Sequence, residues 1–286
     1  MQVAETTKIG ILGAGNMGRQ LAILFASNNL PVILWNHQVQ SSFQVEFGRL
    51  ALIQSKLGLI EKERLAEIVG SIRYVTDLAE VAGCSLVLET VKENISIKKQ
   101  VLDQLIQKSG TLKVIATNTS TLSVTELASF TNCPDRFIGL HFFNPPMTMK
   151  LVEVIQGEQT SEETLQMAMQ IIGRLGKHPV VLPETPGFVV NRLLFPMINE
   201  AVFLLSEGVS DVKVIDGCMR MGVNHPMGPL ELADMIGLDV CLSILETLMD
   251  ETGDIKYRPA PLLKKYVRAG KLGKKTGCGF YSYKKN

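Results

Sequence analysis

The feature that most constrains the fold is a glycine-rich turn near the N-terminus. A short apolar run, Lys8-Ile-Gly-Ile-Leu-Gly13, leads into Gly13-Ala-Gly15-Asn16-Met17-Gly18, and apolar residues at helical spacing follow over positions 21–25. A strand, a glycine turn and a helix in this order are typical of a dinucleotide-binding unit. Gly13 would permit the tight turn, Gly15 the approach of a pyrophosphate, and Gly18 close helix packing. The phosphates would lie at the helix N-terminus, where unpaired N–H groups favour negative charge.

Short apolar runs and helical patterns continue to alternate after this unit. We expect strands at 32–35, 71–75, 84–89 and 114–117 and helices over 41–69 and 94–107. This alternation predicts an α/β fold with a doubly wound, parallel sheet of the Rossmann type. Ligands of such sheets bind beyond the carboxyl ends of the strands, where Glu93, Ser120 and His141 fall.

A turn-rich segment, Pro183-Glu-Thr-Pro186-Gly187, is expected to separate two domains, because 286 residues are long for a single core. We predict a Rossmann domain over residues 1–183 and an all-helical domain over residues 184–286. Helices are expected at 191–207, 212–221, 229–249 and 261–269, and Phe280, Tyr281 and Tyr283 as packing anchors of the tail. The first of these helices has an apolar surface wide enough to be buried in a bundle or at a subunit contact.

The position after the second strand is unusual. NAD-binding sites commonly have an acid there, which accepts the ribose 2′-hydroxyl, whereas this chain has Asn36. An amide can bind the hydroxyl but carries no charge to repel a 2′-phosphate. Since no Arg or Lys stands in residues 36–42, we expect NAD, with NADP not excluded. Lys92 is a second departure, because an apolar or acidic residue is expected at its position.

The segment from His141 to Val154 has the residues for proton transfer. It contains His141, the amide of Asn144, two prolines and an apolar, strand-like run in which Glu153 is the only acid. An imidazole that takes a proton repeatedly needs a fixed tautomer and a stabilised cation, and a partly buried carboxylate supplies both. We interpret His141 as a general base oriented by Glu153. The alternative is a core histidine and an edge-strand glutamate, since the two residues meet only if a turn separates them.

Composition argues against several other classes of protein. Hydrophobic residues make up 46% and charged residues 20% of the chain, and the net charge of +1 gives no sign of attraction to nucleic acid or membrane. The five cysteines are scattered, with no CxxC pair and no clustered histidines. This pattern argues against a disulfide framework or a metal site and for a reducing compartment. Without an apolar leader or an 18-residue apolar run, the protein is expected to be cytoplasmic.

Several further motifs occur in a familiar order. They are Asn118-Thr-Ser120-Thr-Leu, His141-Phe-Phe-Asn144-Pro, Lys150-Leu-Val-Glu153-Val, Pro186-Gly-Phe-Val-Val-Asn191-Arg, His225-Pro-Met-Gly-Pro-Leu230 and Lys274-Lys-Thr-Gly-Cys-Gly-Phe-Tyr281. Together with the N-terminal glycine turn, they resemble the L-3-hydroxyacyl-CoA dehydrogenases, most closely the short bacterial 3-hydroxybutyryl-CoA dehydrogenases. The resemblance covers nearly the whole chain.

The resemblance implies an NAD-linked oxidation of a 3-hydroxyacyl-CoA, such as 3-hydroxybutyryl-CoA, or the reverse reduction, as in fatty acid metabolism. His141 would take the proton of the substrate hydroxyl as hydride leaves C3, and Glu153 would hold the imidazole. Ser120 matches the serine that contacts this hydroxyl, and Asn191 the asparagine that positions the substrate. It also implies a homodimer, which we expect to form through the helical domain.

Cofactor contacts implied by the resemblance include Glu93, Lys98 and Asn144, besides Asn36 and the glycine turn with Asn16 and Met17. Three alternatives stay open because of Asn36 and Lys92. The substrate is a hydroxyacyl group on a carrier protein of secondary metabolism, or a free hydroxy acid, or the chain is a silent relative that only binds dinucleotide. The complete set of catalytic residues argues against the third alternative.

Overall fold

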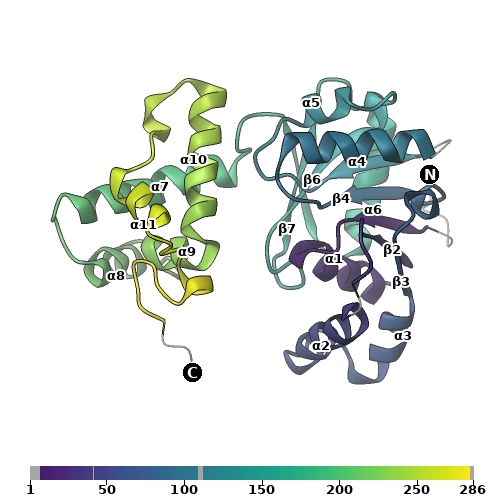
Figure 1. Ribbon diagram of the computed structural model, residues 1–286, viewed down its shortest axis with the longest axis horizontal. Helices are drawn as coiled ribbons and strands as arrows, with labels where there is room; N and C mark the ends of the chain where they lie inside the picture. Colours follow the sequence, from purple (N-terminus) through teal and green to yellow (C-terminus); the bar gives the residue numbers. More distant parts are fainter. Residues whose placement is uncertain (1–6, 41, 109–111, 284–286) are drawn as a thin grey trace. The chain divides into compact units, whose positions relative to one another are not determined.

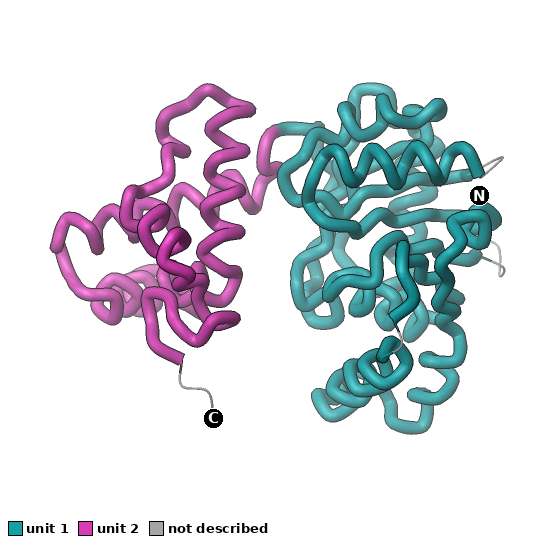
Figure 2. Tube along the Cα trace, in the orientation of Figure 1, with its two compact units in different colours: residues 1–185 teal, residues 186–286 magenta. Residues whose placement is uncertain are grey.

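The computed structural model describes residues 7–40, 42–108 and 112–283 and divides into two compact units, Met1–Thr185 and Pro186–Asn286 (Figure 2). The division lies inside the turn-rich segment, two residues after the boundary expected from the sequence. We refer to the two parts as unit 1 and unit 2. In the described part of the chain, no helix combines the length and the apolar character needed to span a bilayer.

Unit 1 is built on eight strands. They are β1 (Ile9–Leu12), β2 (Val32–Trp35), β3 (Ile72–Val75), β4 (Leu86–Glu89), β5 (Val114–Thr117), β6 (Phe137–Phe142), β7 (Leu151–Gln156) and β8 (His178–Pro183). They form one sheet in the order β3-β2-β1-β4-β5-β6-β7-β8, and all neighbours from β3 to β6 are parallel. The Rossmann-type arrangement expected from the sequence is confirmed, and the carboxyl ends of β1, β2 and β4 lie side by side.

The expectation of a parallel sheet is wrong at one pair of strands. β7 runs antiparallel to β6, whereas β8 is parallel to β7. Parallel neighbours need a crossover of a dozen or more residues, and the segment 143–150 between β6 and β7 is too short for one. The chain therefore reverses directly and brings two segments of the predicted catalytic stretch side by side.

Helices cover the sheet of unit 1. They are α1 (Asn16–Ser27), α2 (Phe43–Lys56), α3 (Leu65–Gly70), α4 (Ile95–Lys108), α5 (Val124–Ser129) and α6 (Glu162–Arg174). In Figure 1, α4 and α5 lie on one side of the strands and α1 on the other. The single helix expected over residues 41–69 is instead α2 and α3, because Gly58, with φ of +73°, ends the first one.

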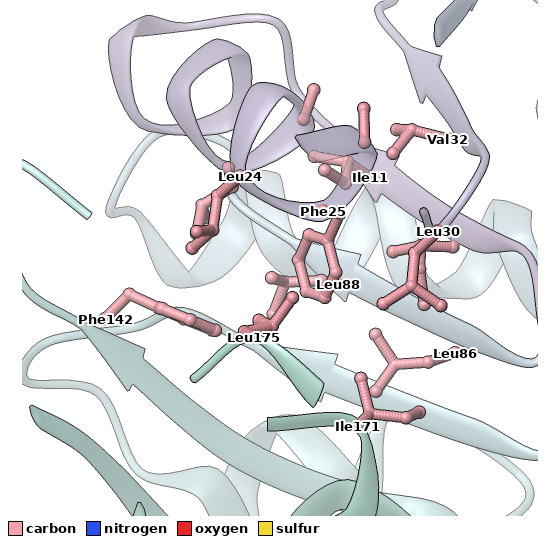
Figure 3. Close-up of a cluster of buried hydrophobic side chains, with 14 of the residues drawn as sticks. Ile11, Leu24, Phe25, Leu30, Val32, Leu86, Leu88, Phe142, Ile171 and Leu175 are labelled. Carbon is pink, nitrogen blue, oxygen red and sulfur yellow. The ribbon is translucent and has the colours of Figure 1, made fainter. Parts of the chain in front are cut away.

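Alternate residues of the strands form the core under α1 and α6. In Figure 3, Phe25 of α1 lies among Ile11, Leu30 and Leu88, and its ring contacts that of Phe142 edge-on, with centroids 6.2 Å apart. β1, β4 and β5 are buried along their whole length, and their residues are apolar except for Glu89 and Thr117 at the ends of β4 and β5. The rigid sheet fixes the positions from which the loops at its carboxyl edge extend.

Unit 2 is all-helical, as expected. Its helices are α7 (Val190–Ser206), α8 (Val212–Gly222), α9 (Pro229–Ile236), α10 (Leu238–Thr252) and α11 (Pro261–Arg268). Their shared core includes Phe195, Ile198 and Val202, so much of the apolar surface of α7 is buried within the bundle. One helix was expected over residues 229–249, but the chain breaks at Gly237, where φ is +111°. Residues other than glycine rarely adopt this conformation, so α9 and α10 are separate elements.

The tail of unit 2 is fixed by two buried acids. Asp216 of α8 accepts hydrogen bonds from the N–H groups of Leu230 and Glu231, at the start of α9, and from the hydroxyl of Tyr281. Asp234 of α9 accepts from the N–H groups of Phe280 and Tyr281 and from the hydroxyl of Tyr283. Burial raises the pKa of Asp234 above its ordinary value. The tail aromatics thus anchor the chain through polar as well as apolar contacts.

Candidate active site

The glycine turn joins β1 to the N-terminus of α1. Gly13 has φ of +104°, and a Cβ at Gly18 would overlap the carbonyl oxygen of Gly13. A Cβ built at Gly15 would have no heavy atom within 4 Å, so this position faces open space. The turn is therefore tight at its two ends and open in the middle, where the N-terminal N–H groups of α1 offer an anion site.

A cavity of about 510 Å³ lies beside this turn. Its walls are residues 13–15, the end of β2 with Trp35, Asn36 and His37, the segment 90–92 after β4, and side chains of α4 such as Ile97. Asn36 is buried, and its Nδ2 donates to the carbonyl of Gln38 at 3.0 Å. Open space at the helix N-terminus, an amide at the ribose position and apolar walls fit the adenosine and pyrophosphate of a dinucleotide.

A residue that the sequence analysis missed links the turn to the segment after β6. Nε2 of Gln20, on α1, donates to Oδ1 of Asn144 at 2.9 Å and to Oδ1 of Asn16 at 3.2 Å. Met17, the neighbour of Asn16, packs against the hydrophobic core of unit 1. Asn16 and Asn144, two predicted cofactor residues that are far apart in sequence, therefore belong to one hydrogen-bonded group.

Glu93 holds the loop that follows β5. Its Oε1 accepts from the hydroxyl of Thr119 at 2.5 Å and from the N–H of Ser120 at 2.8 Å. Longer contacts join the same oxygen to the hydroxyl of Ser120 at 3.3 Å and to the N–H of Thr121 at 3.3 Å. The position of Ser120 is thus set by the carboxylate of Glu93.

Lys98 and Glu89 form an ion pair beneath Glu93 that is buried from solvent. Nζ of Lys98 is 2.8 and 2.7 Å from the two carboxylate oxygens of Glu89 and 3.1 Å from Oε2 of Glu93, and its side chain is 1% exposed. Glu89 also accepts from the hydroxyl of Thr117 and the N–H of Val91. Lys98 therefore reaches the site only through Glu93. Glu89 and Thr117 were missed by sequence reasoning, although an acid at the end of an apolar strand is a usable signal.

These contacts shift the pKa values of Lys98 and Glu93. Burial by itself would lower the pKa of Lys98, but the charges of Glu89 and Glu93 outweigh it and raise that pKa above the ordinary value. Burial would likewise raise the pKa of Glu93, yet the charge of Lys98 and the hydrogen bonds from Thr119 and Ser120 hold it below the ordinary value. Both groups stay charged around neutral pH.

His141 and Glu153 are direct neighbours across the β6–β7 pair. Residues opposite each other in adjacent strands point to the same face of the sheet. Nδ1 of His141 lies 2.7 Å from Oε2 of Glu153, and the two residues are 6% and 1% exposed. A carboxylate in its ionised form can only accept, so Nδ1 is the donor when it faces an ionised Glu153. The ring of Phe143 contacts the imidazole, with centroids 4.5 Å apart.

Asn191, the remaining predicted site residue, belongs to unit 2. It is the second residue of α7 and is buried. Among the residues of known placement, no group of three or more His, Cys, Asp or Glu side chains is arranged to hold a metal ion.

Two family models cover almost the whole chain. The model described as "3-hydroxyacyl-CoA dehydrogenase, NAD binding domain" matches residues 8–185, and "3-hydroxyacyl-CoA dehydrogenase, C-terminal domain" matches residues 187–283. The chain belongs to the 3-hydroxyacyl-CoA dehydrogenase family. The resemblance stated from the motifs is confirmed, and this family member is an oxidoreductase whose unit 1 is an NAD-binding domain.

Individual proteins agree with the family assignment. The chain is 44% identical to a 3-hydroxybutyryl-CoA dehydrogenase of Clostridioides difficile over 97% of this chain and 100% of the relative. The crystal structure of the (S)-3-hydroxybutyryl-CoA dehydrogenase of Ralstonia eutropha matches 98% of this chain and 100% of its own, with 41% identity and a TM-score of 0.92. A diketoreductase with dicarbonyl substrates matches with 30% identity and a TM-score of 0.83, again over 98% and 100%.

Proposed function

We propose that this family member transfers hydride between NAD(H) and C3 of a 3-hydroxyacyl-CoA or 3-ketoacyl-CoA, with 3-hydroxybutyryl-CoA as its substrate. Relatives of that name at 44% and 41% identity support the choice of substrate. The observation that carries the chemistry is the buried pair of His141 and Glu153, joined at 2.7 Å. Bound NAD supplies the hydride acceptor, and the protein supplies the base.

In the oxidation, Nε2 of His141 takes the proton of the substrate hydroxyl while hydride leaves C3. In the reduction, the same nitrogen returns the proton. Because Glu153 accepts the hydrogen of Nδ1, it fixes the tautomer that leaves Nε2 basic, and its charge stabilises the imidazolium. The low exposure of both residues strengthens this electrostatic interaction.

Ser120 and Asn191 orient the substrate in this proposal. The hydroxyl of Ser120 binds the substrate oxygen that His141 deprotonates, and the hydrogen bond from its N–H to Glu93 keeps it in place. Asn191, at the start of α7, supplies an amide for the acyl group. Neither residue changes its charge during the reaction, so their contribution is positioning of the reacting atoms.

The residues proposed to hold the cofactor follow the cavity of unit 1. The turn from Gly13 through Gly15, Asn16 and Met17 to Gly18 binds the pyrophosphate, and Asn36 binds the adenosine ribose. Glu93, which Lys98 holds in place, and Asn144 belong to the nicotinamide end. The contacts of Glu93 with Ser120 and of Asn144 with Gln20 support this placement.

The test is the initial rate of acetoacetyl-CoA reduction by NADH. We expect turnover in the wild type and a loss of about 10²–10⁴-fold in His141→Ala, with a smaller loss in Glu153→Gln. His178→Ala is the matched control, because this histidine is exposed on β8, and it should retain the wild-type rate. Undiminished turnover in His141→Ala would refute the assignment of the base.

The diketoreductase acts on dicarbonyl compounds, and this relative favours one alternative, in which the substrate carries no CoA. The test compares three substrates: acetoacetyl-CoA, acetoacetate, and an acetoacetyl group on an acyl carrier protein. Their kcat/KM values distinguish the CoA proposal from the two alternatives. A higher kcat/KM for either of them would replace the CoA proposal and leave the roles of His141 and Glu153 intact.

We also propose a homodimer formed through unit 2. Val214 and Met221 lie seven positions apart on α8 and so share one face of the helix, to which the exposed Cys218 also belongs. Met221 is 85% exposed, and Val223, just after the helix, is exposed as well. A second copy of the same face would cover these apolar side chains.

A further inference from the structure

The two unusual residues of the sequence line the same cavity. Asn36 follows β2 and Lys92 follows β4, and both strands flank β1, so their carboxyl ends lie about 10 Å apart. Both residues, with His37, line the cavity beside the glycine turn. The lining contains no Asp or Glu. The adenosine end of this site therefore lacks the acid that normally selects NAD.

The ammonium group of Lys92 is available to a ligand. Lys92 is exposed and takes part in none of the ion pairs among residues 7–40, 42–108 and 112–283. Its neighbour Glu93 does not neutralise it, because that carboxylate is bound to Lys98 and to the loop at Thr119.

Arg19 is not the cation that a ligand would meet in this cavity. Its guanidinium is already bound to the carbonyl of Ala14, to Gln40 and to Glu46, and it does not line the cavity. Lys92 therefore supplies the uncompensated positive charge, and His37 adds a further nitrogen donor or acceptor.

We propose that this cavity accepts a ribose 2′-phosphate through Lys92, so that the protein binds NADP(H) at least as tightly as NAD(H). Asn36 permits the phosphate because it carries no negative charge, and the lysine ammonium attracts it. The proposal rests on the dinucleotide site of the proposed function but not on the acyl substrate. It assigns to Lys92 a role in coenzyme specificity.

The test uses two small probes that differ by one phosphate, 5′-AMP and adenosine 2′,5′-bisphosphate. Trp35 is the single tryptophan of the chain and lines the cavity, so its fluorescence reports binding without any reaction. Isothermal titration calorimetry measures the same two affinities independently. We expect the wild type to bind the bisphosphate at least as tightly as 5′-AMP.

Lys92→Met keeps most of the length of the side chain and removes its charge. We expect it to weaken the bisphosphate about tenfold, the scale of one lost charge-assisted hydrogen bond, and to leave 5′-AMP within twofold. Asn36→Asp should weaken the bisphosphate relative to 5′-AMP, because its carboxylate repels a 2′-phosphate but accepts a hydrogen bond from a 2′-hydroxyl. Lys99→Met is the matched control, because Lys99 lies over the ring of Phe130, does not line the cavity and should change neither affinity.

Two outcomes would overturn the proposal. One is a wild-type affinity for 5′-AMP that is higher than its affinity for the bisphosphate. The other is an equal loss for both probes in Lys92→Met, which would place the lysine at the shared part of the nucleotide. A protein that does not reduce acetoacetyl-CoA but binds the two probes with the expected ratio of affinities would refute the proposed function alone. The probes need no acyl substrate.

Discussion

Lys98 is the buried charge on which the order of the candidate site depends. Removing a charge from water costs several kcal/mol, and an ion pair offsets that cost only when its geometry and hydrogen bonds are complete. Here each donor of Lys98 meets a carboxylate oxygen of Glu89 or Glu93. The fixed interior charge holds Glu93, which in turn holds Ser120.

Glu93 gives this arrangement a measurable pH dependence. Its pKa in the folded protein lies below the ordinary 4.5, so its ionised form stabilises the fold above that pH and the contribution is lost as the pH falls through the folded-state value. We expect Glu93→Gln to lower the free energy of unfolding at pH 7, and the difference from wild type to shrink below about pH 4.5.

Urea unfolding curves recorded across this pH range measure the effect. Glu61→Gln is the control, because Glu61 is exposed and belongs to none of the ion pairs found among the described residues. If the difference in the free energy of unfolding between wild type and Glu93→Gln stays constant with pH, the ion pair between Glu93 and Lys98 is not its cause.

The residues of the candidate site differed in how clearly the sequence pattern predicted their roles. His141 and Glu153 stood out because few side chains accept protons near neutral pH, and the structure places them face to face. Glu89 and Lys98 were harder to connect, because nine positions and a loop separate them and only the packing of α4 on the sheet brings them together. Gln20 gave no signal, since a glutamine on a helix is usually solvated.

The β1–turn–α1 element allows packing and ligand binding to be tested separately. In Gly18→Ala the added methyl overlaps the carbonyl of Gly13, so we expect a loss of about 1–3 kcal/mol in the free energy of unfolding. In Gly15→Ala the methyl points into open space, so stability should be unchanged while NADH affinity falls, because the methyl occupies the space of the pyrophosphate.

Thermal unfolding and NADH fluorescence titration check the two variants. Unchanged NADH affinity in Gly15→Ala would show that the nucleotide does not approach this turn. Equal stability of Gly18→Ala and the wild type would show that the helix shifts to accommodate the methyl.

Regular elements were predictable where periodicity and length were unambiguous. The strand at 114–117 has its predicted ends, and the first helix of unit 2 begins and ends one residue before its predicted bounds. The breaks at Gly58 and Gly237 were missed, because an isolated glycine inside a helical pattern does not reveal its φ angle. The direction of β7 was missed because alternation in sequence does not specify it, whereas the short link from β6 does.

At the scale of the whole molecule, the exposed face of α8 predicts self-association. Met221→Asp puts a charge at the centre of the proposed contact, so we expect it to convert a dimer to a monomer in size-exclusion chromatography with light scattering. Val45→Asp is the control, since Val45 is similarly exposed on α2 of unit 1. A wild-type protein that is monomeric at micromolar concentration, or a dimeric Met221→Asp, would contradict the proposal.

The polar anchoring of the tail has a consequence for biosynthesis. A ribosome makes Asp216 and Asp234 well before Phe280, Tyr281 and Tyr283, which supply several of their hydrogen bonds. Unit 1 contains all partners of its sheet by residue 185 and can fold while translation continues. Unit 2 completes its structure only after Tyr283 has left the exit tunnel, so a nonsense mutation just upstream of Phe280 would leave Asp216 and Asp234 without these donors.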